Sequence, residues 1–178
     1  MAGEKNSKIK LNNTLMFIIN LFNDNNIKNW FIAYGTLLGI VRNNSCIEGD
    51  DDIDIIIDRS YHDIVKKLLI ENVNNIIFEH VYNKPNDKNI LKTKSTDNYC
   101  SVDFYMAEVD TKGNFNDTWE NVIWSECYNE KNELIQQMWK GHILYLPASY
   151  ETKLLRRYGE KWRIPQNNKG PQPKKKQL

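Results

Sequence analysis

A run of isoleucines interrupted by aspartate constrains the fold of this chain more than any other feature. Residues 53–57 read Ile-Asp-Ile-Ile-Ile and predict a buried strand, because β-branched residues favour strands. Side chains alternate along a strand, so Asp52 and Asp54 point to one face while Ile53 and Ile55 point to the other. Neighbouring carboxylates in apolar surroundings repel each other and lose hydration, so they require a cation. Oxygen ligands of this kind suit Mg²⁺ or Mn²⁺.

Two other structures are compatible with so dense an acidic run. A solvated acidic loop is the usual outcome, but the isoleucines favour a strand. A calcium-binding loop would use Asp50, Asp52 and Asp54 at its first, third and fifth positions. Its sixth position would then be Ile55 instead of glycine, and its twelfth would be Tyr61 instead of glutamate, so the sequence does not fit this loop.

A glycine turn precedes the acidic strand. Residues 30–34 predict a short buried strand that ends at Gly35, and residues 36–42 predict a helix. A helix N-terminus directs unpaired backbone N–H groups at an anion, and the helix dipole adds to the attraction. Gly35 and Thr36 are therefore predicted to bind a substrate phosphate beside the carboxylates. Metal ligands next to a phosphate site are what phosphoryl or nucleotidyl transfer needs.

A third carboxylate is expected from another strand. Asp103 stands among apolar residues, where an unpaired carboxylate is penalised. We expect it to join Asp52 and Asp54 in a catalytic site, to bind the metal and to accept the proton of an attacking hydroxyl. The alternative is a surface aspartate on an edge strand. Asp110 and Asp117 lie in turn-like contexts and are weaker candidates.

The remaining segments predict one domain over residues 1–165. The expected helices are residues 8–25, a helix capped by Ser60 that extends to about residue 71, and a helix capped by Ser149 that extends to about residue 158. The expected strands are near residues 76–82, 90–93, 99–109 and 141–146. Residues 166–178 are polar and contain three consecutive lysines, which predicts a disordered basic tail.

Two separated motifs occur in this chain. The first is Gly35-Thr36-Leu37-Leu38-Gly39, followed by Arg42 and by Asp50-Asp51-Asp52-Ile53-Asp54-Ile55. The second comprises Gly141, Pro147, Tyr150, Leu154, Tyr158-Gly159, Trp162 and Pro165. Together they resemble the LicD family, which includes bacterial phosphocholine transferases and fukutin-related ribitol-phosphate transferases. The resemblance extends from about Trp30 to Pro165.

This resemblance implies an α/β (α+β) nucleotidyltransferase fold, a small mixed β-sheet flanked by helices. It implies a CDP-linked alcohol as donor and a sugar or glycan as acceptor, with transfer of phosphocholine or a polyol phosphate and release of CMP. Asp52, Asp54 and Asp103 match the expected metal triad, and Asp50 matches a further acidic position.

Several basic residues are candidates for substrate contacts. Arg42 matches a family position and is predicted to neutralise donor phosphates, with a salt bridge to Asp50 or Asp51 as an equal alternative. On the last helix, Lys153, Arg156 and Arg157 form a basic patch for which a solvated face is favoured. The other interpretation of that patch is contact between Lys153 or Arg157 and phosphate or cytidine.

Two other functions stay open. A nucleotidyltransferase would use the same residues to transfer NMP from an NTP to a nucleic acid, a protein or a small molecule. A catalytically inactive nucleotide-binding module would keep only the binding. The formal net charge of +1 argues against stable nucleic-acid binding. We expect no signal peptide, no membrane span and a cytoplasmic location, and we expect the three widely spaced cysteines to be reduced.

Overall fold

The computed structural model describes residues 7–72, 77–79, 88–165 and 176–178. Its helices are α1 (Ser7–Asp24), α2 (Tyr34–Asn43), the 3₁₀ helix η1 (Arg59–Tyr61), α3 (His62–Glu71) and α4 (Tyr150–Tyr158). Its strands are β1 (Trp30–Ile32), β2 (Asp52–Asp58), β3 (Ile77–Glu79), β4 (Ile90–Lys94), β5 (Ser101–Val109), β6 (Phe115–Asp117), β7 (Val122–Trp124), β8 (Ile135–Trp139) and β9 (His142–Leu146).

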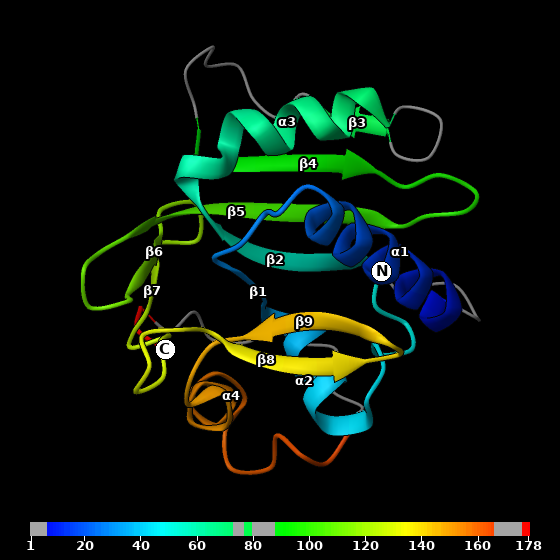
Figure 1. The fold of residues 1–178 in the computed structure, drawn as a ribbon. Coiled ribbons are helices and arrows are strands. Elements are labelled where there is room, and N and C mark those ends of the chain that lie inside the picture. The colour runs from blue at the N-terminus through cyan, green and yellow to red at the C-terminus, as the bar shows by residue number, and fades with distance from the viewer. Residues whose placement is uncertain (1–6, 73–76, 80–87, 166–175) are drawn as a thin grey trace.

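The main sheet is mixed, as expected. Its strands lie in the order β1-β2-β5-β4-β3, and β6 and β7 extend it from β5. The pairing of β2 with β5 is parallel, and the other pairings are antiparallel. A separate hairpin of β8 and β9 lies outside the main sheet, and β9 packs against β1 and α1 (Figure 1). Helix α2 packs against β2 of the main sheet, and α3 packs against β3 and β4. The sequence analysis did not predict β6, β7 or β8.

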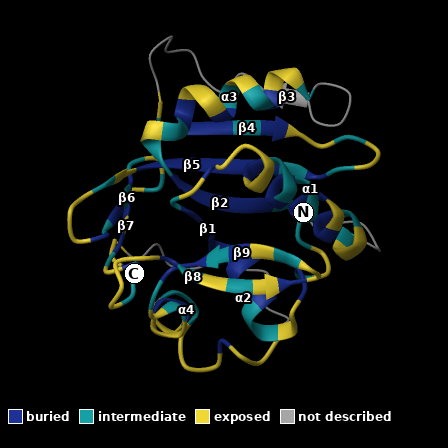
Figure 2. Cartoon of the chain, in the orientation of Figure 1, coloured by how far each residue is buried: buried dark blue, intermediate teal, exposed yellow. Residues whose placement is uncertain are grey.

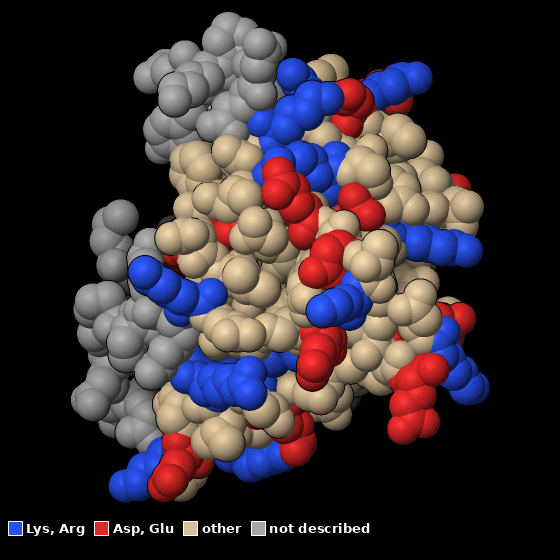
Figure 3. Space-filling view, turned by 90° about the vertical axis from the view of Figure 1, so that its left-hand side faces the viewer, with Lys and Arg blue, Asp and Glu red and all other residues tan. Residues whose placement is uncertain are grey.

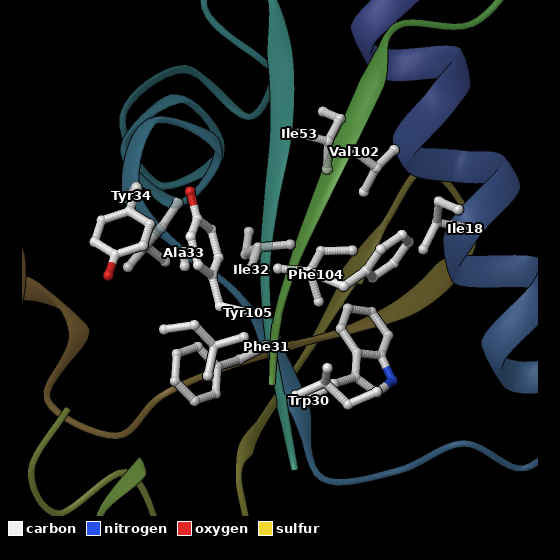
Figure 4. Packing of buried hydrophobic residues seen from close by; sticks show 14 of the residues in the cluster. Ile18, Trp30, Phe31, Ile32, Ala33, Tyr34, Ile53, Val102, Phe104 and Tyr105 are labelled. Atoms are coloured by element: carbon white, nitrogen blue, oxygen red, sulfur yellow. The ribbon is translucent and has the colours of Figure 1, made fainter. Parts of the chain in front are cut away.

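The two faces of β2 and β5 have different neighbours. Ile53, Val102 and Phe104 point to the face that α1 covers (Figure 4). There Phe22 of α1 packs against Phe104, with ring centroids 5.8 Å apart. The central strands are buried along most of their length (Figure 2). The other face carries the aspartates and Tyr105, so the core fixes which way the acidic side chains point.

Three helix starts differ from the predictions. Ser60 was predicted to cap the helix after β2. That segment instead begins with η1, whose cap is the carboxylate of Asp58, which accepts a hydrogen bond from the N–H of Ser60 (2.8 Å). Helix α2 begins at Tyr34, so Gly35 lies inside its first turn. Ser149 does precede α4, but its φ is 53° and its side chain makes no capping hydrogen bond.

Residues 176–178 lie beside β7. The N–H of Ile123 donates to the carbonyl of Lys176 (3.0 Å), and the N–H of Leu178 donates back to the carbonyl of Ile123 (2.8 Å). The side chain of Leu178 is fully buried. Residues 166–175 lie outside the described part of the chain, so the disordered tail over residues 166–178 stays a prediction. No helix among the described residues is long and apolar enough to cross a membrane.

Candidate active site

The parallel pairing of β2 with β5 brings the predicted carboxylates to one face. Asp54 is the register partner of Asp103, and Asp52 is the partner of Ser101. Registered residues of parallel neighbours point the same way, so all three carboxylates share a face. Tyr105 lies two residues beyond Asp103, and its hydroxyl donates to Oδ1 of Asp54 (3.2 Å).

Two glycines of α2 let the loop before β2 lie directly on the helix. A Cβ at Gly35 would be 2.6 Å from Oδ2 of Asp50, and a Cβ at Gly39 would be 2.7 Å from the carbonyl oxygen of Ser45. Positions 35 and 39 lie one helical turn apart, so they present one face to residues 45–50. The Gly-x-x-x-Gly spacing therefore places the carboxylate of Asp50 against the first turn of α2, where the helix dipole favours negative charge.

Helix α1 holds the same loop from the other side. The side-chain oxygen of Asn12 accepts a hydrogen bond from the N–H of Cys46 (3.0 Å). The hydroxyl of Ser7 accepts one from the N–H of Gly49 (2.8 Å). These contacts fix both ends of the segment that delivers Asp50, and nothing in the sequence pattern pointed to them.

The carboxylates are not all equally close. Ligand oxygens of Asp50, Asp51 and Asp52 lie within 4.8 Å of one another. Asp54 and Asp103 are not part of this group, and each has a partner of its own. Tyr105 binds Asp54, and Oδ2 of Asp103 forms an ion pair with Lys92 Nζ (2.7 Å). The structure thus places the predicted triad on one face without drawing its oxygens together.

The electrostatics of these carboxylates indicate uncompensated negative charge. Burial and then the charge of Asp103 raise the pKa of Asp52 to about 7. Burial and then Asp52 raise the pKa of Asp54 well above its ordinary value. Burial also raises the pKa of Asp50 and of Asp103, although Lys92 opposes the shift at Asp103. Each shift means that the protein alone does not stabilise the ionised form.

This donor set fits a divalent cation. All candidate ligands are carboxylate oxygens, which Mg²⁺ and Mn²⁺ prefer. Oδ1 of Asp103 is buried without a hydrogen-bond partner, so it has a free lone pair on the acidic face. Asp50, Asp52, Asp54 and Asp103 would hold the ion, and the exposed Asp51 adds a carboxylate close to those of Asp50 and Asp52.

The predicted phosphate-binding turn has a second role. Oγ1 of Thr36 accepts a hydrogen bond from the N–H of Asp54 (2.9 Å), so the hydroxyl ties α2 to β2. The carboxylate of Asp50 occupies the space over Gly35 that we had assigned to a phosphate. Phosphate binding by the backbone of Gly35 and Thr36 stays a prediction.

Arg42 lies near the C-terminal end of α2. Within the described residues it makes no ion pair with Asp50 or Asp51, so the predicted alternative of a salt bridge is wrong. Its Nε is buried without a hydrogen-bond partner. It lines a groove of about 690 Å³ together with Tyr150 and Met138. An unpaired guanidinium nitrogen is consistent with an anionic ligand, as the sequence analysis proposed.

The basic patch on α4 separates into three different environments. Lys153 is only 4% exposed, and its Nζ donates to the carbonyl of Ala148 (2.8 Å). Lys153 thus stabilises the start of α4 through this hydrogen bond, and the predicted substrate contact is not supported for this residue. Arg156 is exposed, as a solvated face requires. Arg157 instead lies over the ring of Tyr34, with its Cζ 4.9 Å from the ring centroid.

Several residues that support the site were not predicted from the sequence. Tyr34 donates through its hydroxyl to Oδ2 of the fully buried Asp117 (2.8 Å). The other oxygen of Asp117 accepts from the N–H groups of Trp119 (3.0 Å) and Glu120 (3.1 Å), so this carboxylate is structural. The alternation of Tyr105 with Asp103 was a usable signal for Tyr105. No such signal existed for Lys92, because its position opposite Asp103 depends on the register of β4.

Three comparisons place the chain among known proteins. No curated protein sequence matches it significantly. A similar solved structure is that of the lincosamide antibiotic adenylyltransferase LnuA with lincomycin bound. It gives a TM-score of 0.55 at 17% identity, over 80% of this chain and 82% of that chain. A likeness at this identity concerns the fold, and it supports a nucleotidyltransferase-like fold.

The sequence model described as LicD/FKTN/FKRP, nucleotidyltransferase domain, matches residues 26–147. This match includes both glycines of α2, the acidic strand β2 and Asp103 of β5. It covers more than half of the chain, and the chain therefore belongs to the LicD family.

Proposed function

We propose that this protein is a metal-dependent phosphotransferase. In this proposal it moves phosphocholine or a polyol phosphate from a CDP-linked donor to a hydroxyl group of a sugar or glycan. The observation that carries the proposal is the parallel pairing of β2 with β5, which puts Asp52, Asp54 and Asp103 on one face beside the first turn of α2. Family membership supports a nucleotide-linked donor.

A divalent cation, Mg²⁺ or Mn²⁺, is part of the proposal. The high pKa of Asp52, the crowding of Asp50 against Gly35 and the unpaired Oδ1 of Asp103 all support a site that a cation completes. Asp50, Asp52, Asp54 and Asp103 would bind the ion. When bound, it would neutralise the phosphate charge that builds up during transfer.

The side chains of this chain have distinct roles in the reaction. The hydroxyl oxygen of the acceptor attacks the distal phosphorus of the donor, the bond from this phosphorus to the bridging oxygen breaks, and CMP leaves. Asp103 accepts the proton of the hydroxyl through Oδ1, because Lys92 occupies Oδ2. Arg42 orients the donor phosphates, and the N–H groups of Gly35 and Thr36 join it where the carboxylate of Asp50 turns from Gly35 towards the ion.

Nucleotidyl transfer is the second candidate. One observation favours it, since the similar solved structure is an enzyme that its description calls an adenylyltransferase. A small hydroxylated acceptor suits this candidate better than nucleic acid. On the face seen in Figure 3, Lys and Arg side chains are interspersed with Asp and Glu, and no continuous basic surface runs across its described part.

Isothermal titration tests the donor class. We would titrate CDP-choline, CDP-ribitol, CMP and ATP with and without Mg²⁺, on wild type and on the variant Asp52→Ala/Asp54→Ala. Asp24→Ala, an exposed aspartate at the end of α1, is the matched control for loss of negative charge. We expect Mg²⁺-dependent binding of a CDP-linked alcohol that the double variant loses and the control keeps.

Other outcomes point elsewhere. Binding of ATP alone would favour nucleotidyl transfer. Binding that depends on neither Mg²⁺ nor the aspartates would contradict the metal site. Binding of the donor without turnover, assayed by release of CMP in the presence of sugar acceptors, would favour an inactive binding module.

A further inference from the structure

The guanidinium of Arg157 is held in an unusual environment. Its Nε and Nη1 are both buried, and neither has a hydrogen-bond partner. Within the described residues no carboxylate forms an ion pair with it. Burying two donors of a permanent cation without partners is unfavourable, so such a group calls for a ligand. The neighbouring Arg156 shows the alternative, because it is exposed to water.

Arg157 rests on a ring that is fixed from several sides. The hydroxyl of Tyr34 is tied to the buried Asp117. Its ring packs edge-on against the rings of Tyr105 and Trp124, with 5.3 Å between centroids in both cases. The φ of Tyr34 is 42°, a conformation that a bulky residue adopts only when its surroundings enforce it. Tyr34 is therefore a rigid platform, and the guanidinium stacked on it has little freedom.

The platform adjoins the acidic face. Tyr34 and Tyr105 lie on the same side of the sheet, opposite Phe104 (Figure 4). The hydroxyl of Tyr105, whose ring contacts that of Tyr34, binds Asp54. Burial raises the pKa of Tyr158, the neighbour of Arg157, and the charges of Asp54 and Asp50 raise it further, whereas the charge of Arg157 and a side-chain hydrogen bond with it oppose the shift. The C-terminal end of α4 thus borders the carboxylates.

A phosphorylated substrate needs positive charge at this place. Four aspartates at positions 50, 51, 52 and 54 repel phosphate, and a divalent ion offsets only part of that charge. A planar guanidinium offers parallel N–H donors that match two oxygens of a phosphate group.

We infer that Arg157, positioned by Tyr34, binds the diphosphate of the substrate beside the acidic face. The inference rests on the proposed function only in that the substrate carries a diphosphate, which CDP-linked alcohols and nucleoside triphosphates share. Tyr34 is a positioning residue in this assignment, and Asp117 fixes Tyr34.

Inorganic pyrophosphate is the probe that tests this assignment. We would measure its binding by isothermal titration in the presence of Mg²⁺ on wild type, Arg157→Gln and Arg157→Lys. Arg156→Gln removes the same charge from the next position of α4 and is the matched control. Thermal unfolding of each variant reports whether the fold is kept.

We expect Arg157→Gln to weaken pyrophosphate binding by about tenfold or more, because charge-assisted hydrogen bonds are lost. Arg157→Lys should lose less, since it keeps the charge without the planar fork, and Arg156→Gln should bind as wild type does. A purely structural role would lower the unfolding temperature of Arg157→Gln and leave pyrophosphate affinity unchanged.

Three results would overturn the assignment. They are wild-type affinity in Arg157→Gln, equal losses in the variants at positions 156 and 157, and absence of pyrophosphate binding to the wild type. If Arg157→Gln does not fold, the test uses Arg157→Lys instead. Pyrophosphate affinity equal to that of the wild type in Arg157→Lys would then count against the assignment. Pyrophosphate binding that depends on Arg157, without binding of any CDP-linked alcohol, would reject the proposed donor and keep this inference.

Discussion

The carboxylate of Asp50 lies directly against the backbone of Gly35, so close that a Cβ at position 35 would be 2.6 Å from Oδ2. The contact joins the loop before β2 to the first turn of α2. It explains why a glycine occupies a helical position where alanine has the higher helix propensity.

Gly35→Ala should impair metal binding more than folding. The added methyl group meets the end of a flexible side chain, so Asp50 rotates away and the fold is kept. We expect the free energy of unfolding to stay within about 1 kcal/mol of wild type, because better helix propensity offsets the crowding. Mg²⁺ affinity, measured by isothermal titration, should fall. Unchanged affinity would mean that Asp50 is not a ligand.

Gly39→Ala is the counterpart that should impair folding. Its methyl group would be 2.7 Å from the carbonyl oxygen of Ser45 and 3.0 Å from the backbone nitrogen of Ile47, and backbone cannot rotate away. We expect a loss of about 1–3 kcal/mol in urea denaturation, the usual cost of overpacking. A variant as stable as Gly35→Ala would show that the loop at residues 45–47 shifts freely.

Asp52→Asn should stabilise the metal-free protein. Burial, and then the charges of Asp103, Asp50 and Asp51, raise the pKa of Asp52 to about 7. The cost to stability grows as the pH rises from the ordinary aspartate pKa towards 7 and is complete above it, so removing the charge should add about 1–2 kcal/mol at pH 8 in EDTA. The stabilisation that Mg²⁺ gives the wild type should disappear in this variant.

Thermal unfolding with EDTA and with Mg²⁺ measures both effects of Asp52→Asn. Asp24→Asn, at an exposed position of α1, is the control and should change neither value. A lower unfolding temperature for Asp52→Asn in EDTA would show that Asp52 is held by contacts that outweigh the repulsion.

Tyr34→Phe should lower the free energy of unfolding considerably, although it removes only one hydroxyl group. It leaves Oδ2 of the fully buried Asp117 without its donor, and an unpaired buried carboxylate oxygen costs about 1–3 kcal/mol. Urea denaturation measures the loss. Tyr128→Phe is the comparison, because its hydroxyl donates to the partly exposed Asn29 (2.7 Å) and water can replace it. Equal losses would argue against a special role for the buried pair.

Much of the site could be predicted from local sequence pattern. The alternation of aspartate and isoleucine places Asp52 and Asp54 on one face of β2, because the strand period of two is a property of the backbone alone. The glycine motif likewise predicts α2, although its first residue proved to be Tyr34. These features depend on neighbours a few residues away, so the sequence by itself determined them.

Other features were decided only by the tertiary structure. Helical spacing puts Lys153 and Arg157 on one face of α4, but only the docking of α4 buries the first and stacks the second on Tyr34. The pairing of Asp54 with Asp103 joins strands about 50 residues apart, and its register follows from how the whole core packs.

The position of Asp50 was also decided by the tertiary structure. It depends on contacts from α1 and on the space above Gly35, which involve residues far apart in the chain. The sequence thus determined which chemical groups the site contains. Packing between distant segments decided their distances and partners, because the free energy of such packing is shared among many residues and is not encoded in any single short motif.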